Sequence, residues 1–277
     1  MQVVRTRADL RAILAAAPRP VGLVPTMGWL HAGHVSLVER ARAECATVVM
    51  SIFVNPRQFG EARDFEGYPR NEGRDLERAE AAGVDIVFAP GADEVYPPGF
   101  DTLVSVGAIA QPLEGAARPG HFDGVATVVA ILFALVGAER AYFGLKDYQQ
   151  IAVIRRMALD LALPTQVVPC PTVREADGLA LSSRNARLTV DGRARAAVLH
   201  HALDAGATLV RSGEPSAEAV RAAVRAVLAT ERAAMLDYVS VADPDTLEEL
   251  AAVHGRALLS LAVSIEGVRL IDNVLAG

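Results

Sequence analysis

The chain has 277 residues, of which 52% are hydrophobic and 22% charged, and its formal net charge is −6. This apolar content suffices for a sizeable core and excludes a disordered or fibrous chain, while the length suggests two domains. The acidic balance and the lack of a long Lys/Arg run exclude a broad positive surface. We therefore expect neither a nucleic acid nor a membrane as partner.

Three local features bear on cellular location. The longest uncharged apolar stretch, Gly124 to Ala138, is shorter than the about 17 to 25 residues of a membrane-spanning helix, so we expect a buried core helix there. Charged residues near the start occupy the place of the apolar segment of a secretory signal. Cys45 and Cys170 stand apart in apolar surroundings, which favours buried, reduced thiols. These features predict a cytoplasmic protein.

In the first part of the chain, short β-rich segments alternate with segments of helical periodicity. We expect strands at 21–25, 47–54, 84–88, 141–143 and 165–168, and helices at 33–45, 72–82, 124–138 and 147–161. Such alternation is typical of a parallel sheet with helices on both faces. The predicted fold class is therefore α/β, with a doubly wound, Rossmann-like sheet.

The pattern changes near residue 190. Two helices rich in Ala, Arg and Glu precede three β-like segments near 235–241, 257–263 and 268–271. We expect a smaller α+β domain there, so the predicted domains are 1–175 and 176–277. Because the break at 172–177 can serve as a hinge, we predict that the second domain is a lid over a nucleotide site in the first.

Several common nucleotide-binding and zinc-binding motifs are missing. None of the 22 glycines form a Gly-x-Gly pair, so the dinucleotide fingerprint does not occur. Gly28 and Gly33 have the spacing of a P-loop, but His34 and Val35 follow instead of Lys and Ser or Thr. A His-Glu-x-x-His zinc motif is also absent. A Rossmann dehydrogenase, a P-loop enzyme and a zinc enzyme of that type are therefore disfavoured.

A histidine pair follows the first predicted strand, in Pro25-Thr-Met-Gly-Trp-Leu-His31-Ala-Gly-His34. A strand that turns through glycines into a helix presents backbone N–H groups and the positive end of the helix dipole to a phosphate. Both imidazoles could donate hydrogen bonds to charge that develops there. Alternatively, His31 caps the turn and His34 packs in the helix, but the pairing favours phosphate chemistry. Because no third ligand is near, we expect no metal bound by side chains.

Two amide and lysine clusters follow other predicted strands. Gln58, in Asn-Pro-Arg-Gln-Phe-Gly, could orient a carboxylate or hydroxyl at the carboxyl edge of the sheet. Lys146, in Gly-Leu-Lys-Asp-Tyr-Gln-Gln, could meet phosphate charge, with Gln150 one turn into the next helix. A solvated lysine beside a capping aspartate explains the second cluster equally well.

Two hydroxyls and a guanidinium lie just beyond the domain boundary, at Ser182, Ser183 and Arg184. Small donors beside an arginine suit a triphosphate or pyrophosphate. A polar hinge loop is the alternative, and local spacing does not decide between them.

Five motifs in this order resemble the pantoate–β-alanine ligase (pantothenate synthetase) family, one of the His-x-Gly-His nucleotidylyl transferases. They are Pro-Thr-Met-Gly-x-Leu-His-x-Gly-His, Asn-Pro-x-Gln-Phe, Arg-Pro-Gly-His-Phe-Asp-Gly-Val, Gly-x-Lys-Asp-Tyr-Gln-Gln and Gly-Leu-Ala-Leu-Ser-Ser-Arg-Asn. The resemblance, from about Val21 to Leu188, implies an AMP-forming ligase. The carboxylate of (R)-pantoate attacks the α-phosphorus of ATP bound with Mg²⁺, and β-alanine then attacks the pantoyl adenylate to give pantothenate and AMP. A homodimer is also expected.

The resemblance implies specific roles for residues of this sequence. The expected catalytic residues are His31, His34, Lys146 and Arg184. Gln58 and Gln150 would bind pantoate. The ATP site would contain Met27, Gly28, Trp29, Leu30, His31, Ala32, Gly33, His34, Gly144, Leu145, Lys146, Asp147, Val173, Leu181, Ser182, Ser183 and Arg184. Leu145 departs from the family, which usually has a glutamate there, and the matching Arg118 and His121 have no role that the sequence explains.

Two other functions compete with this one. Another His-x-Gly-His nucleotidylyl transferase would act on a phosphorylated acceptor, but Gln58 and Gln150 stand where such an acceptor needs a second Arg/Lys cluster. A non-catalytic nucleotide-sensing module would bind ATP without releasing pyrophosphate. Product analysis distinguishes all three.

Overall fold

The structure, a computed structural model, describes residues 1–60 and 62–277 and consists of two compact units. The first comprises Met1–Leu145 and Gln149–Pro171, and the second comprises Lys146–Tyr148 and Thr172–Gly277. The chain thus passes into the second unit at Thr172, slightly before the predicted boundary after residue 175. The short segment Lys146–Tyr148, which the sequence placed in the first domain, packs with the second unit.

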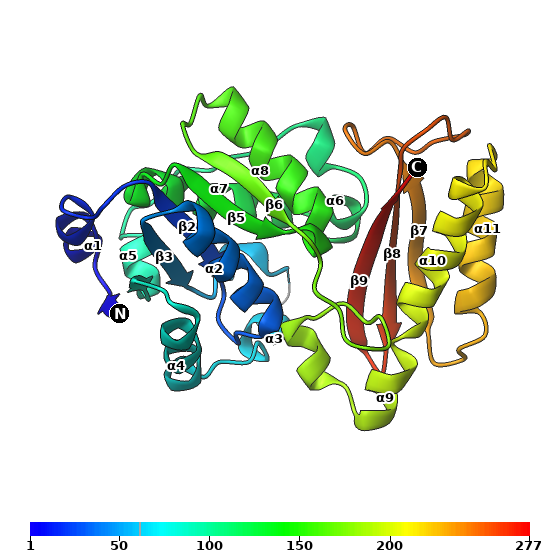
Figure 1. Cartoon of the computed structure of the whole chain (residues 1–277), viewed down its shortest axis with the longest axis horizontal. Helices are drawn as coiled ribbons and strands as arrows, with labels where there is room; N and C mark the ends of the chain where they lie inside the picture. Colours follow the sequence, from blue (N-terminus) through cyan, green and yellow to red (C-terminus); the bar gives the residue numbers. More distant parts are fainter. Residues whose placement is uncertain (61) are drawn as a thin grey trace. The chain divides into compact units, whose positions relative to one another are not determined.

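The first unit contains a six-stranded parallel sheet in the order β1-β4-β3-β2-β5-β6 (Figure 1). Its strands are β1 (Gln2–Val4), β2 (Val21–Thr26), β3 (Thr47–Ile52), β4 (Ile86–Phe88), β5 (Arg140–Gly144) and β6 (Gln166–Cys170). The connections run outward from β2 through β3 to β4, and in the other direction from β5 to β6. This reversal places a topological switch point between β2 and β5, where open α/β sheets bind ligands at the carboxyl ends of the strands.

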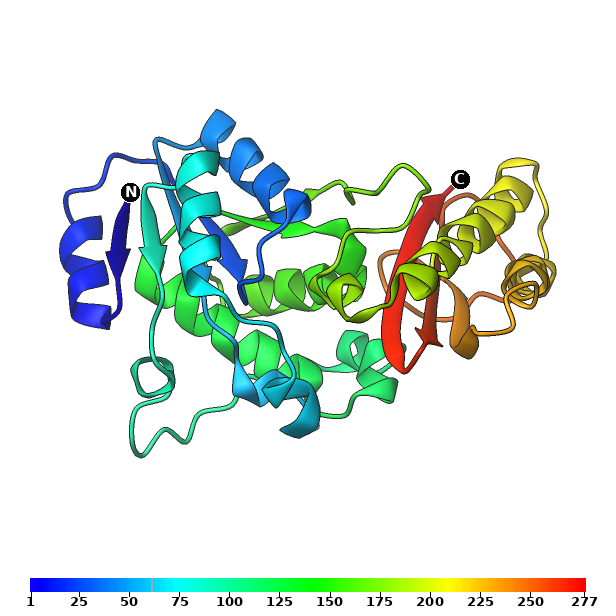
Figure 2. The ribbon, with the colours of Figure 1, turned by 90° about the horizontal axis from the view of Figure 1, so that it is seen from below.

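Helices cover both faces of this sheet, which confirms the doubly wound α/β fold (Figure 2). Residues of α2 (Ala32–Glu44) and α4 (Glu72–Ala82) belong to one core, and residues of α1 (Arg7–Leu14), α7 (His121–Val136) and α8 (Tyr148–Asp160) to the other. The shorter helices are α3 (Ala62–Glu66), α5 (Ala92–Val95), α6 (Glu114–Ala117), and the 3₁₀ turns η1 (Pro56–Gln58), η2 (Ala108–Ala110) and η3 (Leu145–Asp147). The sequence did not predict β1 or α1.

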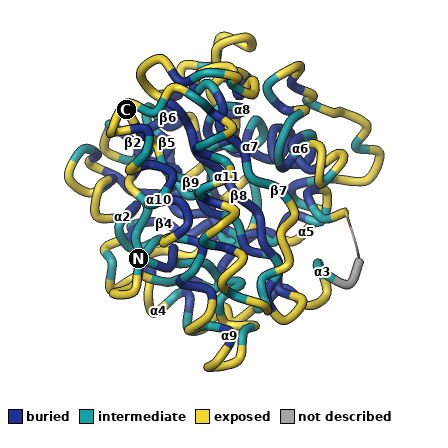
Figure 3. Tube along the Cα trace, turned by 90° about the vertical axis from the view of Figure 1, so that its right-hand side faces the viewer, coloured by how far each residue is buried: buried dark blue, intermediate teal, exposed yellow. Residues whose placement is uncertain are grey.

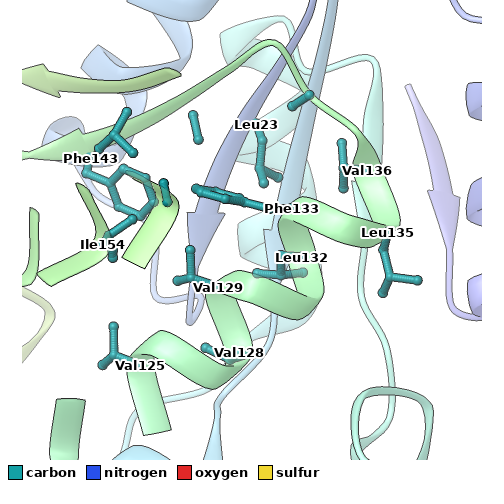
Figure 4. Close-up of a cluster of buried hydrophobic side chains, with 14 of the residues drawn as sticks. Leu23, Val125, Val128, Val129, Leu132, Phe133, Leu135, Val136, Phe143 and Ile154 are labelled. Atoms are coloured by element: carbon teal, nitrogen blue, oxygen red, sulfur yellow. The ribbon is translucent and has the colours of Figure 1, made fainter. Parts of the chain in front are cut away.

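Successive strand residues point to opposite faces, which divides the apolar side chains between the two cores. In β2, Leu23 belongs to the core beneath α7, whereas Val24 belongs to the core beneath α2. Figure 4 shows Leu23 and Phe143 beside Phe133 of α7. Helix α7 is apolar and largely buried, as predicted, although it begins at His121 rather than Gly124. No helix in the described part of the chain is long and apolar enough to span a bilayer.

The second unit packs helices on a three-stranded antiparallel sheet, which confirms the smaller α+β domain. Its elements are η4 (Ser183–Arg187), α9 (Val190–Arg195), α10 (Val198–Arg211), α11 (Ala217–Leu228), β7 (Met235–Ala242), β8 (Ala257–Ile265) and β9 (Val268–Ala276). The central strand β8 is buried along nearly its whole length (Figure 3). Gly206 brings α10 close to its neighbours, because a Cβ there would lie 2.6 Å from Val224 and 2.8 Å from Leu259.

Both cysteines, Cys45 and Cys170, are buried and free, as predicted. Burial raises the pKa of the Cys170 thiol, which disfavours the reactive thiolate. The two side chains are therefore structural parts of the first unit.

Candidate active site

The backbone makes a tight turn where β2 ends at the switch point. Thr26 Oγ1 donates a hydrogen bond to the Ser51 carbonyl on β3 (2.7 Å) and accepts one from the Gly28 N–H (3.2 Å). Gly28 and Trp29 then adopt successive left-handed conformations, with φ of 80° and 51°. A Cβ on Gly28 would also lie 2.9 Å from Asp75 Oδ2. Conformation and close packing therefore both require glycine at position 28.

His31 and His34 form a reciprocal cap at the start of α2. His31 Nδ1 accepts a hydrogen bond from the Gly33 N–H (3.1 Å), and His34 Nδ1 accepts one from the His31 N–H (3.3 Å). The ring centroids are 4.1 Å apart. Because Nδ1 is the acceptor in each neutral ring, the proton resides on Nε2. The capping interpretation is thus confirmed for His31, and it leaves Nε2 as the donor nitrogen of both rings.

The side chain of Gln58 is oriented by Asn55, which comes just before η1. Asn55 Nδ2 donates to Gln58 Oε1 (3.0 Å) and to the Gly124 carbonyl (3.0 Å), while the Tyr96 hydroxyl donates to Asn55 Oδ1 (2.7 Å). Burial raises the pKa of Tyr96 to about 12, so this hydroxyl keeps its proton. Since Oε1 is engaged as an acceptor, Gln58 Nε2 is the donor end of the amide.

Arg118 and His121, whose motif the sequence left unexplained, hold the backbone of Gln58. His121 Nδ1 donates to the Gln58 carbonyl (2.8 Å), and Arg118 Nη2 donates to the same oxygen (3.2 Å). Arg118 Nη1 lies 3.1 Å from His121 Nε2, which then acts as an acceptor. Gly124 permits the close approach of α7, because a Cβ there would lie 2.2 Å from the Arg57 carbonyl.

At the end of β5, Gly144 and Leu145 lie at the same edge of the sheet as the turn after β2, since β2 and β5 are parallel neighbours. The Leu145 side chain packs against the apolar core of the first unit. A leucine in place of the family's glutamate therefore contributes packing and offers no carboxylate. Gln150 lies in the first turn of α8 and is half-buried.

Within the second unit, the segment Lys146–Tyr148 is attached to residues near the C-terminus. The Lys146 carbonyl accepts a hydrogen bond from Asn273 Nδ2 on β9 (2.7 Å), and the Tyr148 hydroxyl donates to the Pro244 carbonyl (3.0 Å). Lys146 Nζ lies 3.5 Å from Asp147 Oδ1, and its side chain is only 14% exposed. This low exposure argues against a fully solvated lysine. The sequence did not predict the contribution of Asn273.

The second unit also brings together the predicted residues between Val173 and Arg184. The Leu181 N–H donates to the Val173 carbonyl (3.0 Å), which closes the loop at its base. Ser182 Oγ caps η4 by accepting from the Arg184 N–H (3.2 Å). Ser183 and Arg184 form the first turn of η4. The hydroxyls and guanidinium predicted to contact phosphates therefore lie on one structured loop.

Fold and site together define a nucleotide-binding α/β protein with a histidine-capped helix at the switch point of its sheet. Residues 2–275 match the family described as pantoate-beta-alanine ligase. The pantothenate synthetase of Roseiflexus sp. (strain RS-1) is 58% identical over 273 residues, which cover 99% of this chain and 98% of the relative. This chain belongs to the pantoate–β-alanine ligase family.

Solved structures agree with this membership. The crystal structure of pantothenate synthetase from Thermus thermophilus has a TM-score of 0.95 and 50% identity, with 99% of each chain covered. Pantoate-beta-alanine ligase from Francisella tularensis, complexed with beta-gamma ATP and beta-alanine, has a TM-score of 0.82 and 33% identity, covering 99% of this chain and 97% of that one. The predicted ligase activity, an ATP-dependent condensation of pantoate with β-alanine, is thereby confirmed.

Proposed function

We propose that the chain makes pantothenate through a pantoyl adenylate formed at the carboxyl edge of the parallel sheet. The pantoate carboxylate attacks the α-phosphorus of ATP and pyrophosphate leaves. The amine of β-alanine then attacks the acyl carbon, and AMP departs as the amide forms and the amine loses its proton. The observation that carries this proposal is the histidine-capped start of α2 at the switch point, together with the oriented amide of Gln58, which follows the neighbouring strand β3.

In this proposal, residues 27–34 bind the phosphates of ATP. The N-terminus of α2 supplies backbone dipoles, and Nε2 of His31 and of His34 supply donors. Negative charge increases on the phosphate oxygens as the bond to pyrophosphate breaks. Donors already fixed in place stabilise that charge without reorganising, and the carboxylate of pantoate is itself the nucleophile. No nucleophilic side chain is needed.

We further propose that Gln58 and Gln150 bind pantoate. Gln58 Nε2 would donate to a pantoate oxygen, since its Oε1 is held by Asn55. Amides bind a small hydroxy acid well without the charge that a phosphorylated acceptor demands. This choice of side chains favours pantoate over the acceptors of related nucleotidylyl transferases.

The second unit completes the ATP site in the proposed working state. Lys146, Ser182, Ser183 and Arg184 of this unit would contact the phosphates. Asp147, Val173 and Leu181 of the same unit, with Gly144 and Leu145 of the first unit, would complete the nucleotide pocket. Movement of this unit as a lid would exclude water, which matters because an exposed acyl adenylate hydrolyses. The division of the chain into two compact units, with the last crossing between them at Pro171–Thr172, supports the proposal of a lid.

Magnesium, assembly and location complete the proposal. No three His, Cys, Asp or Glu residues within 1–60 and 62–277 are grouped to hold a metal ion. We propose that Mg²⁺ would enter bound to the triphosphate of ATP and would offset part of its negative charge. We propose that the chain forms a homodimer, which light scattering of the purified protein would test. We also propose that it is located in the cytoplasm.

Pyrophosphate release tests the function. With ATP, Mg²⁺ and (R)-pantoate alone, we expect a burst stoichiometric with enzyme, and steady turnover only after β-alanine is added. If no pyrophosphate is released with pantoate but it is released with a phosphorylated acceptor, the result would instead support a related nucleotidylyl transferase. ATP binding without any pyrophosphate would support a nucleotide-sensing module.

A further inference from the structure

A buried carboxylate from outside the five motifs holds the turn between β2 and α2. Asp75 lies on α4, is 1% exposed, and accepts two backbone hydrogen bonds from this turn. Its Oδ2 accepts from the Trp29 N–H and its Oδ1 from the Leu30 N–H, both at 2.8 Å. Burying a carboxylate is costly unless hydrogen bonds compensate, so these two donors account for its place in the interior.

Two arginines from the same helix hold the other side of this turn. Arg74 Nη2 and Arg78 Nη1 both donate to the Leu30 carbonyl, at 3.2 and 2.6 Å. The Arg74 guanidinium also lies 4.4 Å from the centroid of the Trp29 ring. Helix α4 therefore binds both the N–H and the carbonyl of Leu30, the residue immediately before the cap residue His31.

The turn needs such support because its backbone is strained. Trp29 has a φ of 51°, in the left-handed region that is unfavourable for a residue with a side chain. Conformations of this kind persist only where the surroundings fix them. If the turn relaxed, the backbone of His31 would shift, and with it the reciprocal hydrogen bonds that orient both imidazole rings.

We propose that Asp75 is a positioning residue for the adenylation step. Its carboxylate fixes the strained turn so that His31, His34 and the N-terminus of α2 meet the phosphates in their reactive geometry. The inference rests on the proposed binding of ATP by residues 27–34. It assigns Asp75 no contact with substrate. A misplacement of about 1 Å at a reacting centre can cost about 100-fold in rate, so a small relaxation of this turn suffices.

Asp75→Asn tests the proposal, because the amide keeps the volume but turns an NH₂ group toward one of the two backbone donors. We expect pyrophosphate formation from ATP and pantoate to slow about 10- to 100-fold. Synthetic pantoyl adenylate supplied with β-alanine should still be converted at nearly the wild-type rate, because that half-reaction releases no pyrophosphate. A role confined to folding would lower both half-reactions together, in step with the folded fraction, and would overturn the proposal.

Asp85→Asn is the matched control. Asp85 Oδ2 accepts the Val48 N–H at the amino end of β3 (2.7 Å) and also pairs with Arg42, so the same substitution weakens carboxylate contacts away from the turn. We expect some loss of thermal stability without selective loss of adenylation. Equal adenylation rates in the Asp75 and Asp85 variants would also overturn the proposal.

Two further variants make the result decisive. If Asp75→Asn does not fold, Arg78→Met is the substitute. It removes the hydrogen bond from the exposed Arg78 side chain to the Leu30 carbonyl. Wild-type pyrophosphate formation in that variant would contradict the positioning role. His34→Asn separates the two hypotheses. If it leaves adenylation unchanged, the proposed phosphate site is wrong; if it slows adenylation while Asp75→Asn does not, only the role of Asp75 is wrong.

Discussion

The two loops proposed to bind ATP are stabilised in different ways. The turn at residues 27–34 is held from outside, by Ser51 through Thr26 and by Asp75 on α4. The loop at residues 173–184 closes mainly on itself, and Arg174 connects it to Asp272 on β9 within its own unit. The first arrangement suits a site that is fixed before substrate binds. The second suits a loop that travels with its unit.

The largest expected effect is on the fixed turn. In His34→Asn, the shorter amide keeps an acceptor for the cap but removes the Nε2 donor, so the kcat of pyrophosphate formation should fall about 10²- to 10³-fold. Single-turnover assays with ATP and pantoate measure this rate. Ser36→Ala is the control, since it removes only a hydrogen bond from Ser36 Oγ to the Gly33 carbonyl on the same helix. A wild-type kcat in a folded His34→Asn enzyme would show that this ring does not assist the reaction.

The second expected effect concerns the ion pair that connects the loop at residues 173–184 to β9. Asp272 binds Arg174 through two hydrogen bonds of 2.6 and 2.9 Å, with its side chain only 1% exposed. Asp272→Ala leaves the partly buried guanidinium without its counter-charge, so the free energy of unfolding in urea should fall by about 3 kcal/mol. Asp237→Ala breaks the more exposed pair with Arg269 and should cost about 0–1 kcal/mol. Equal losses in the free energy of unfolding would mean that the buried Asp272 stabilises the protein no more than the exposed Asp237.

A third prediction tests the lid itself. Arg184→Ala should slow pyrophosphate formation about 10- to 100-fold, the effect of losing one hydrogen bond to a charged group worth about 1.5–3 kcal/mol. It should also release free AMP and pantoate when β-alanine is scarce, because the adenylate is less protected from water. Arg187→Ala, an exposed position on the same η4, is the control. Unchanged adenylation without excess AMP would leave the second unit without a role as a lid.

Local sequence predicted the parts of the site that are built from adjacent residues. The strand, the glycine turn and the histidine cap are consecutive, so their chemistry was visible in one motif. Asp75 was missed because it is 45 residues from Leu30 in the sequence and its partners are backbone N–H groups, which carry no side-chain signature. For His121 the motif was visible but the partner was not, since the Gln58 carbonyl lies 63 residues away.

The fold likewise contains elements that local sequence predicts and elements that depend on distant partners. The longer strands and helices followed from periodicity, whereas β1, with three residues, is defined mainly by its pairing with β4. The segment Lys146–Tyr148 reads as the start of a helix in the first domain, and only its tertiary contacts, such as that between Lys146 and Asn273, place it with the second unit. Short elements and segments shared between units depend on partners that local sequence does not specify.

The smallest expected effect is the pH dependence of the loop at residues 173–184. His200 packs against Gly178 so closely that a Cβ there would lie 2.0 Å from its ring, and its buried Nδ1 has no hydrogen-bond partner among the described residues. Burial is the main cause that lowers the pKa of His200, and the positive charge of Arg174 lowers it further. The negative charges of Asp272 and Asp204 offset this lowering only in part. Positively charged His200 is therefore disfavoured in the folded protein.

The sign of the pH dependence follows from this lowered pKa. Between the folded-state pKa and the unfolded value of about 6.5, the unfolded chain binds more protons, so His200 makes stability fall as the pH decreases through that interval. His200→Gln removes the titrating group, and its free energy of unfolding should change less between pH 7 and pH 5 than that of the wild type. His254→Gln, at an exposed histidine, is the control for the substitution itself. If His200→Gln keeps the wild-type slope, the titration of His200 does not destabilise the loop in acid, and the contrast between the two loops has no pH component.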